Sequence, residues 1–454
     1  MDKNNLCENN LRENNLRENN LRENNLTVAI LTLGCKVNQY ESEAVAKLFT
    51  DSGCTLTENL ETADIIIVNT CAVTAVSSKK SRQIIHRATR NPNAVIAVMG
   101  CYAQSAPKEI SNIEGVNVIM GTADKLKVAE LVEQALKNRD EKFFNVTRAE
   151  DITAFEELPH MPQRTRAFMK IEDGCNNFCA YCIIPYLRGR VRSRSLDNIK
   201  AECELLAAKG YKEIVLTGIH IGAYGRDLGG KVTLVDAIKT VLSYAAPLRL
   251  RLGSLESAEM SDELIDLMKS DSRICNHVHL PLQSGSDEIL KLMRRPYNTK
   301  MFDALTARLV KEIPDISIGT DLIAGFPNED EKFFTETLEF VKAQPFSKIH
   351  VFPFSAREGT IAATMENQVP PQIKKLRTAQ LIEVSDEKEM SFRKKLIGKN
   401  VEIIAETESE NLFDGLTKNY VRVFVPANGK IKSGDVINVS VQKIFNNGVL
   451  GGSL

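Results

Sequence analysis

Three cysteines, Cys175, Cys179 and Cys182, fall within one short stretch of the sequence. Iron–sulfur cubanes are normally held by four thiolates, so a Cys-x3-Cys-x2-Cys loop leaves one iron with an open position for a small molecule. Zinc sites built from cysteine use facing Cys-x2-Cys pairs, which this spacing fits poorly. An odd number of cysteines without a secretory signal disfavours disulfides. The spacing therefore predicts a reactive iron–sulfur cluster.

A second triad, Cys35, Cys71 and Cys101, lies nearer the amino terminus, and each of its members follows a short apolar run rich in β-branched residues. These runs, at residues 27–31, 63–68 and 94–99, alternate with helical segments and indicate a parallel sheet covered on both faces. Ligands of such sheets lie beyond the carboxyl ends of the strands. We therefore expect the three thiolates to converge there; three separate structural cysteines are the alternative.

The sequence resembles a known family at both triads. The loop from Cys175 to Cys182, continued by Ile-Ile-Pro-Tyr-Leu-Arg-Gly-Arg at residues 183–190, resembles the signature of the methylthiotransferase branch of radical S-adenosylmethionine (SAM) enzymes. The stretches 34–43, 69–71 and 100–104 are similar to the amino-terminal domain of that branch, and the resemblance covers residues 27–454.

The resemblance implies cofactors and site residues. A [4Fe–4S] cluster on Cys175, Cys179 and Cys182 would bind the amino and carboxylate groups of SAM and carry the catalysis. A second [4Fe–4S] cluster would lie on Cys35, Cys71 and Cys101. Later SAM-pocket segments of the family resemble those around Gly218, His220, Gln283 and Asp321.

Composition shifts divide the chain into five parts. Residues 1–26 repeat Leu-Arg-Glu-Asn-Asn with a period of five, which builds no apolar stripe and predicts a disordered extension in which Cys7 has no role. With the resemblance, the other parts are a methylthiotransferase amino-terminal domain at 27–138, a linker at 139–160, a radical SAM core at 161–391 and a TRAM domain at 392–454.

The predicted fold class is α/β. Six strand-like runs follow the linker, at residues 167–171, 213–217, 248–252, 277–280, 316–320 and 348–352. Separated by helical stretches, they predict a partial (βα)6 barrel, whose chemistry lies at the carboxyl-terminal rim. Polar residues follow several of these runs, namely His220, Ser254, Glu256, Gln283, Ser284, Asp321, Ser355 and Arg357.

The carboxyl-terminal segment predicts a small β-barrel. After a helical stretch at 373–396, β-like runs occur at 401–404, 421–425 and 435–441, with turn residues at 414–415, 427–429 and 446–448. The layout resembles the TRAM domain, which implies RNA binding. Residues 392–454 carry nine Lys or Arg against six Asp or Glu, a surplus that a solvated face would also carry.

Four arginines alternate beside the cysteine loop, at Arg188, Arg190, Arg192 and Arg194. If this segment is extended, its period of two places all four guanidinium groups on one side, where they could bind RNA phosphates. Ion pairing with the acidic surface of the protein is the alternative.

The overall composition limits the remaining partners. The net charge is -1, from 58 basic and 59 acidic residues, so RNA contacts must come from local patches and no DNA partner is expected. The ten cysteines, with neither a signal peptide nor a transmembrane run, predict a cytoplasmic protein without a membrane partner. Radical chemistry of this family also needs an electron donor such as flavodoxin or ferredoxin.

Three substrates are known in the family. They are isopentenyladenosine in tRNA, threonylcarbamoyladenosine in tRNA and an aspartate of a ribosomal protein. The motif Leu-Gly-Cys-Lys-Val-Asn at residues 33–38 is most similar to the threonylcarbamoyladenosine branch, which acts at adenosine 37 beside the anticodon. A hypothesis of another class is a non-catalytic iron–sulfur RNA-binding protein, against which the open ligand position argues.

Overall fold

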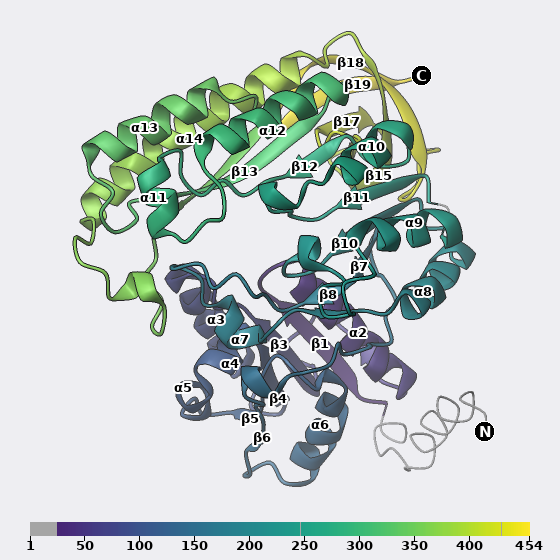
Figure 1. Cartoon of the computed structure of the whole chain (residues 1–454). Helices are drawn as coiled ribbons and strands as arrows, with labels where there is room; N and C mark the ends of the chain where they lie inside the picture. The colour runs from purple at the N-terminus through teal and green to yellow at the C-terminus, as the bar shows by residue number, and fades with distance from the viewer. Residues whose placement is uncertain (1–24, 246, 428) are drawn as a thin grey trace. The chain divides into compact units, whose positions relative to one another are not determined.

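The computed structural model describes residues 25–245, 247–427 and 429–454 (Figure 1). The predicted extension at 1–26 and Cys7 lie outside these residues, except for Asn25 and Leu26. The chain divides into two compact units. The first holds the residues up to 72, 76–147 and 158–161, and the second holds 73–75, 148–157 and 162–454.

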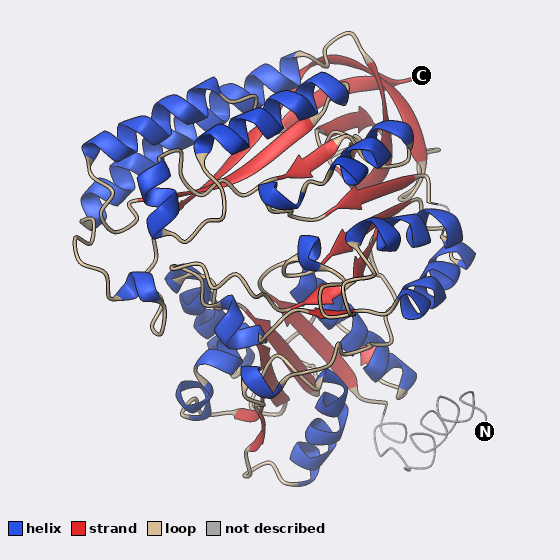
Figure 2. Ribbon diagram, viewed as in Figure 1, coloured by secondary structure: helices blue, strands red, loops and turns tan. Residues whose placement is uncertain are grey.

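The first unit contains a six-stranded parallel sheet in the order β2-β1-β3-β4-β5-β6, as predicted for its first three long strands. Both central strands are buried along their whole length, because their Ile, Val and Ala side chains face helices on either side. The strands are β1 (Thr27–Thr32), β2 (Thr55–Leu56), β3 (Ile65–Thr70), β4 (Val95–Gly100), β5 (Val116–Met120) and β6 (Phe143–Asn145). The helices are α2 (Lys36–Asp51), α3 (Ala75–Ala88), α4 (Cys101–Ser105), α5 (Pro107–Ser111) and α6 (Val128–Lys137) (Figure 2).

The predicted linker at 139–160 is wrong in two places. Strand β6 pairs with β5 and extends the sheet beyond residue 138. Near the other end, the His160 ring packs 4.0 Å from that of Tyr40 between ring centroids, and its Nε2 lies 2.9 Å from Glu43 Oε2. A strand of three residues is too short to show a period, and the His160 contacts are tertiary, so neither has a local signal.

The second unit contains the partial parallel barrel, with all six predicted strands in place. They form two three-stranded sheets, β11-β10-β7 and β12-β13-β14, joined by the parallel bridges Leu250↔Ile274 and Ser254↔His279. The strands are β7 (Arg166–Lys170), β10 (Glu213–Thr217), β11 (Arg249–Leu252), β12 (His277–His279), β13 (Ser317–Ala324) and β14 (Lys348–Pro353). The helices are α8 (Leu196–Ala208), α9 (Leu234–Tyr244), α10 (Asp262–Ser270), α11 (Asp287–Leu292), α12 (Thr299–Glu312), α13 (Glu331–Ala343) and α14 (Pro371–Lys394).

The carboxyl-terminal strands close into a barrel in the order β15-β16-β17-β19-β18, drawn yellow in Figure 1. They are β15 (Asn400–Ser409), β16 (Leu412–Leu416), β17 (Arg422–Pro426), β18 (Val436–Phe445) and β19 (Gly448–Ser453). One predicted turn is wrong, because Asp414 and Gly415 lie inside β16. The hairpin instead turns at Glu410 and Asn411, which both have positive φ angles. Two consecutive residues with positive φ angles form the tight two-residue turn that matches the twist of the paired strands.

Buried arginines attach this small barrel to the amino ends of the partial barrel's strands. Arg249 donates to the carbonyl oxygens of Leu416 and Glu402, at 2.8 and 2.6 Å. Arg251 donates to the carbonyl oxygens of Thr417 and Lys418, at 3.0 and 2.9 Å. The small barrel therefore closes the end of the partial barrel opposite the rim that carries the cysteine loop.

Two carboxylates balance these cations: Glu402, whose Oε1 atom lies 3.0 Å from Arg249 Nη2, and the buried Glu213. The Glu213 oxygens lie 2.8 Å from Arg251 Nε and 3.7 Å from Arg249 Nη1, and these three side chains are buried. Burial opposes ionisation of Glu213, but the neighbouring arginines outweigh it, so the pKa of its carboxyl is lowered. None of the helices in the described part of the chain is long and apolar enough to cross a membrane.

We expect Glu213→Gln to lower the free energy of unfolding by about 3 kcal/mol, because it leaves the buried Arg251 guanidinium without a counter-charge and removes one of the two carboxylates beside Arg249. Urea unfolding followed by far-UV circular dichroism measures this. Glu263→Gln is the matched control, since it breaks only the exposed pair with Lys239 and should keep the wild-type midpoint. Equal midpoints for both variants would contradict the role assigned to Glu213.

Candidate iron–sulfur and S-adenosylmethionine sites

The cysteine loop of the second unit follows β7 and the two-residue strand β8 (Glu172–Asp173). Gly174 opens the loop with a φ of 89°, and a Cβ there would lie 2.0 Å from the carbonyl oxygen of Arg190. Only glycine permits this approach, which lets the Cys175 amide donate to the carbonyl of Gly189 at 3.1 Å. The loop is therefore held at both its start and its return.

Backbone amides point at two of the loop sulfurs. The Asn177 amide lies 3.4 Å from Cys175 Sγ, and the Ile184 amide, at the start of α7 (Ile184–Arg188), donates to Cys182. Burial nevertheless raises the pKa of both thiols to about 12, with those amides opposing the shift. A metal must therefore displace protons from Cys175 and Cys182 when it binds at neutral pH.

His220 and Gly218 lie beside this loop, as the sequence predicted for rim residues after β10. The His220 Nδ1 atom is 3.6 Å from Cys175 Sγ, and its Nε2 atom is 2.8 Å from Glu259 Oε1. Beneath them, the buried Glu172 accepts the His220 backbone amide at 2.6 Å through one carboxylate oxygen, while its Oε1 atom has no hydrogen-bond partner. Burial raises the pKa of Glu172 well above its usual value. A Cβ at Gly218 would lie 2.7 Å from Glu172 Oε2, the same oxygen that accepts the His220 amide, which explains the glycine.

Gln283 and Asp321 lie at the same rim on the other half of the partial barrel. Gln283 takes a positive φ of 69°, and its amide donates to the Asp321 carbonyl at 2.8 Å. The Asp321 carboxylate lies 3.2 Å from His279 Nε2, and His279 Nδ1 contacts the Ser254 hydroxyl at 2.9 Å. The structure thus makes the two residues neighbours; their contact with SAM stays a prediction.

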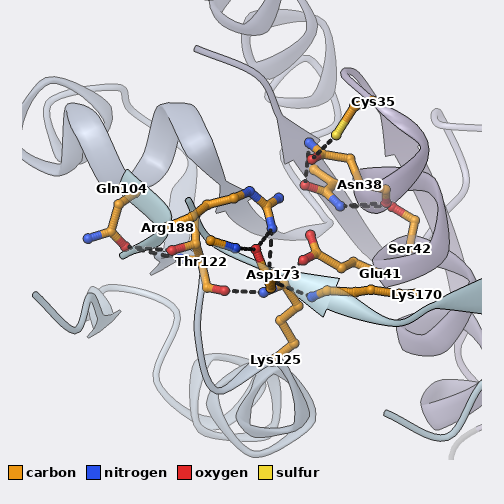
Figure 3. Close-up of polar contacts among 12 residues, drawn as sticks. Cys35, Asn38, Glu41, Ser42, Gln104, Thr122, Lys125, Lys170, Asp173 and Arg188 are labelled. Carbon is orange, nitrogen blue, oxygen red and sulfur yellow. Dashed lines mark hydrogen bonds and ion pairs between the residues drawn. The ribbon is translucent and has the colours of Figure 1, made fainter. Parts of the chain in front are cut away.

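The predicted one-sided arginine strip is wrong. Arg188 ends α7 and is buried against Asp173, with both carboxylate oxygens 3.1 Å from its Nη1 atom (Figure 3). Arg192 donates to the carbonyls of Arg188 and Arg190, at 2.7 Å each, and Arg194 pairs with Glu202. Of the four, only Arg190 is exposed, and it stacks over the Phe178 ring at 4.6 Å.

The strip fails because the segment is not extended. Gly189 has a φ of 77° and reverses the chain between the helix and the short strand β9 (Arg192–Ser193). Three of these arginines form ion pairs, as in the alternative that the sequence left open, but with the buried carboxylates of Asp173 and Glu202 rather than with an acidic surface. RNA binding by Arg190 stays a prediction.

The second triad lies at the carboxyl edge of the amino-terminal sheet. Cys35, Cys71 and Cys101 follow the neighbouring strands β1, β3 and β4. Gly34 has a φ of 123°, and a Cβ there would lie 3.4 Å from the Cβ of Cys71, so the first two cysteine segments touch. The predicted parallel strands are confirmed, and the convergence of the three thiolates on one cluster stays a prediction.

Two buried asparagines join these segments. The Asn38 side chain donates to the carbonyls of Leu33 and Thr70 at 2.8 and 3.0 Å, and Cys35 Sγ lies 3.5 Å from its oxygen (Figure 3). Asn69 donates to the Asn38 carbonyl at 2.9 Å. Sequence reasoning missed these hydrogen bonds, although an asparagine at the end of an apolar strand was a usable signal.

Comparison with known proteins identifies the family. Residues 27–121 match the model described as uncharacterized protein family UPF0004, and residues 169–341 match the Radical SAM superfamily. The chain is 42% identical to "Threonylcarbamoyladenosine tRNA methylthiotransferase MtaB" of Bacillus subtilis (strain 168), over 92% of this chain and 94% of that protein. It is 36% identical to "tRNA-2-methylthio-N(6)-dimethylallyladenosine synthase" of Thermoanaerobacter sp. (strain X514), over 91% and 89%. The chain belongs to the radical SAM methylthiotransferase family.

A solved structure supports the fold assignment. The radical SAM methyltransferase TsrM of Kitasatospora setae, with cobalamin and a [4Fe-4S] cluster bound, superimposes with a TM-score of 0.55 at 15% identity. The match covers 74% of this chain and 77% of that one. This likeness concerns the fold only.

The methylthiotransferase cofactors are two [4Fe–4S] clusters and SAM, and the residues present fit them. Both triads supply soft thiolate ligands, and Gly34 and Gly174 let the backbone before the first cysteine of each triad pack closely where a Cβ would clash. No three His, Cys, Asp or Glu side chains of the described ranges are placed to hold one metal ion. A cubane takes one thiolate on each iron, so its ligands need not converge on one ion.

We expect anaerobically reconstituted methylthiotransferase to hold about eight iron atoms, and both Cys175→Ala and Cys71→Ala to hold about four. The two variants should differ in chemistry: Cys175→Ala should not cleave SAM, whereas Cys71→Ala should still form 5'-deoxyadenosine but no methylthio product. Iron analysis and chromatography of SAM products measure both. The buried Cys203→Ala is the control and should keep all iron. SAM cleavage by Cys175→Ala would overturn the ligand assignment.

Proposed function

We propose that this methylthiotransferase converts N6-threonylcarbamoyladenosine at position 37 of tRNA into its 2-methylthio derivative. The identity to the relative named for that substrate, 42%, exceeds the 36% to the relative named for dimethylallyladenosine. The motif at residues 33–38 supports the same branch. Isopentenyladenosine and a ribosomal-protein aspartate are the competing substrates.

Adenine C2–H is neither acidic nor an easy target for a nucleophile, so its replacement by sulfur needs radical chemistry. When bound, the clusters and SAM supply the radical, the sulfur and the methyl group. The chain's own part is positioning. The close packing of Gly174 on the Arg190 carbonyl holds the start of the loop, and backbone amides contact the sulfurs of Cys175 and Cys182. The rim where SAM would bind is lined by Gly218, His220, Gln283 and Asp321.

An external reductant has to deliver electrons, because no residue of the chain can supply them. A low-potential one-electron donor such as flavodoxin or ferredoxin has that chemistry. We place this chemistry in the cytoplasm, whose reducing environment keeps the ligand thiolates of both triads available.

The outer face of the small barrel carries an aromatic and basic surface that suits RNA. Phe424 of β17 pairs with Leu450 of β19, and Leu450 pairs with Lys443 of β18, so all three share one face. The half-exposed rings of Phe424 and Phe445 pack edge to face with centroids 5.3 Å apart. Aromatic rings that stack on bases beside a cation are typical of barrels that bind single-stranded RNA.

Nucleoside analysis tests the substrate. We expect tRNA from cells that lack this chain to keep unmodified threonylcarbamoyladenosine, and expression of the wild-type chain to restore its 2-methylthio form. Cys71→Ala is the control and should restore nothing. Appearance of methylthiolated isopentenyladenosine instead, or methylthiolation of a ribosomal protein, would show that the substrate is wrong.

Point variants test the RNA surface better than removal of residues 392–454, which would strip Arg249 and Arg251 of their acceptors. Lys443→Ala should lower the salt dependence of tRNA binding by about one unit of slope. Phe424→Ala should weaken binding about tenfold with an unchanged slope, because it removes stacking but no charge. Lys311→Ala, on the exposed side of α12, is the control in filter binding across a salt series. If all three variants bind like wild type, this face does not bind tRNA.

A further inference from the structure

Arg295 is a buried arginine that contacts a cluster cysteine. It lies in the loop between α11 and α12, and its side chain is 2% exposed. Its Nη1 atom is 3.2 Å from Cys179 Sγ and 3.5 Å from the Tyr181 hydroxyl. Its Nη2 atom pairs with Glu256 and lies 3.3 Å from the carbonyl of Pro281.

The surrounding loop aims this guanidinium group. Its Nε atom donates to the Tyr297 hydroxyl at 2.8 Å, and that hydroxyl donates to the Pro281 carbonyl at 2.6 Å. Two residues earlier, the Met293 carbonyl accepts the Ala180 amide at 3.1 Å. The loop therefore grips the Cys179–Ala180 segment by one backbone bond and one side-chain bond.

Arg295 keeps its charge in this buried position. Burial disfavours the charged form, but Tyr181, Tyr297, Glu256 and Cys179 outweigh it, so the pKa of the guanidinium is raised well above its usual value. The same charge opposes the burial-driven rise in the pKa of Cys182. Glu256 pairs with the Nη2 atom, which leaves the Nη1 atom to the sulfur.

We propose that Arg295 is a positioning residue that donates a charged hydrogen bond to the Cys179 ligand sulfur and thereby raises the reduction potential of the radical cluster. The proposal rests on the ligand assignment made above. One-electron reduction by the external donor adds one negative charge to the cluster and its thiolates. A fixed cation bonded to one of those sulfurs stabilises that charge, because hydrogen bonds and net charge set the potentials of such clusters.

The midpoint potential tests this without reference to activity. The background is Cys35→Ala, Cys71→Ala and Cys101→Ala in the full chain, which holds only the radical cluster. In EPR-monitored redox titration, Arg295→Gln should shift the midpoint to a lower value, so that the reduced-to-oxidised ratio at the wild-type midpoint falls about tenfold. Arg295→Lys keeps the charge and should restore most of the shift. Arg273→Gln, which breaks the exposed pair with Asp271, should change nothing.

Each outcome decides the proposal. An unchanged or higher midpoint for Arg295→Gln with about four irons bound would overturn it. If Arg295→Gln does not hold iron, the apo-protein with its native Cys35, Cys71 and Cys101 decides: iodoacetamide should then alkylate Cys179 more slowly than in the wild-type apo-protein, with exposed Cys35 as the internal reference and buried Cys203 as the sign of unfolding. Unchanged or faster alkylation of Cys179 would overturn the proposal. Failure of the proposed function appears separately, as absence of SAM cleavage or methylthio product with Arg295 intact.

Discussion

Parallel pairing of strands is the constraint on which this molecule depends. In each unit, parallel strands bring their carboxyl ends to one edge, so residues distant in sequence become neighbours there. Cys35, Cys71 and Cys101 follow neighbouring strands and so lie at the same edge of the first sheet. In the second unit the cysteine loop, His220 and Asp321 gather at one rim by the same geometry. Parallel pairing thus brings each cysteine triad to the carboxyl ends of strands.

The two ends of the partial barrel use buried charge for different purposes. At the amino ends, Glu213 and Glu402 neutralise Arg249 and Arg251, whose other donors bind carbonyls of the small barrel. At the carboxyl rim, Arg295 pairs with Glu256 and donates to two tyrosine hydroxyls and a cysteine sulfur. The first arrangement fixes a domain in place; the second sets the environment of a reactive thiolate. Both depend on arginine, whose planar fork can serve several acceptors at once while staying charged.

The arginines beside the cysteine loop show how easily a pattern suggests the wrong partner. Alternation at 188, 190, 192 and 194 would make a phosphate-binding strip on a straight strand. The chain instead turns at Gly189, and the carboxylates of Asp173 and Glu202 hold Arg188 and Arg194 inside the protein. A buried guanidinium needs such an acceptor, so each of these pairs also helps to hold the loop that carries the cluster ligands.

The sequence by itself determined the two cysteine triads, the long parallel strands and the presence of a carboxyl-terminal barrel. These follow from spacing and periodicity, which are local properties of the chain. The family follows from the resemblance of its motifs. Only the tertiary structure decided the pairing of β6 and the hairpin at Glu410–Asn411. The same holds for the ion pairs of the arginines beside the cysteine loop, the hydrogen bonds of Asn38 and Asn69, and the contact of Arg295 with Cys179. Each of these depends on partners far away in sequence or on the backbone conformation at one residue. No periodicity reports which distant group a buried polar side chain will meet, because that choice is made when the elements pack together.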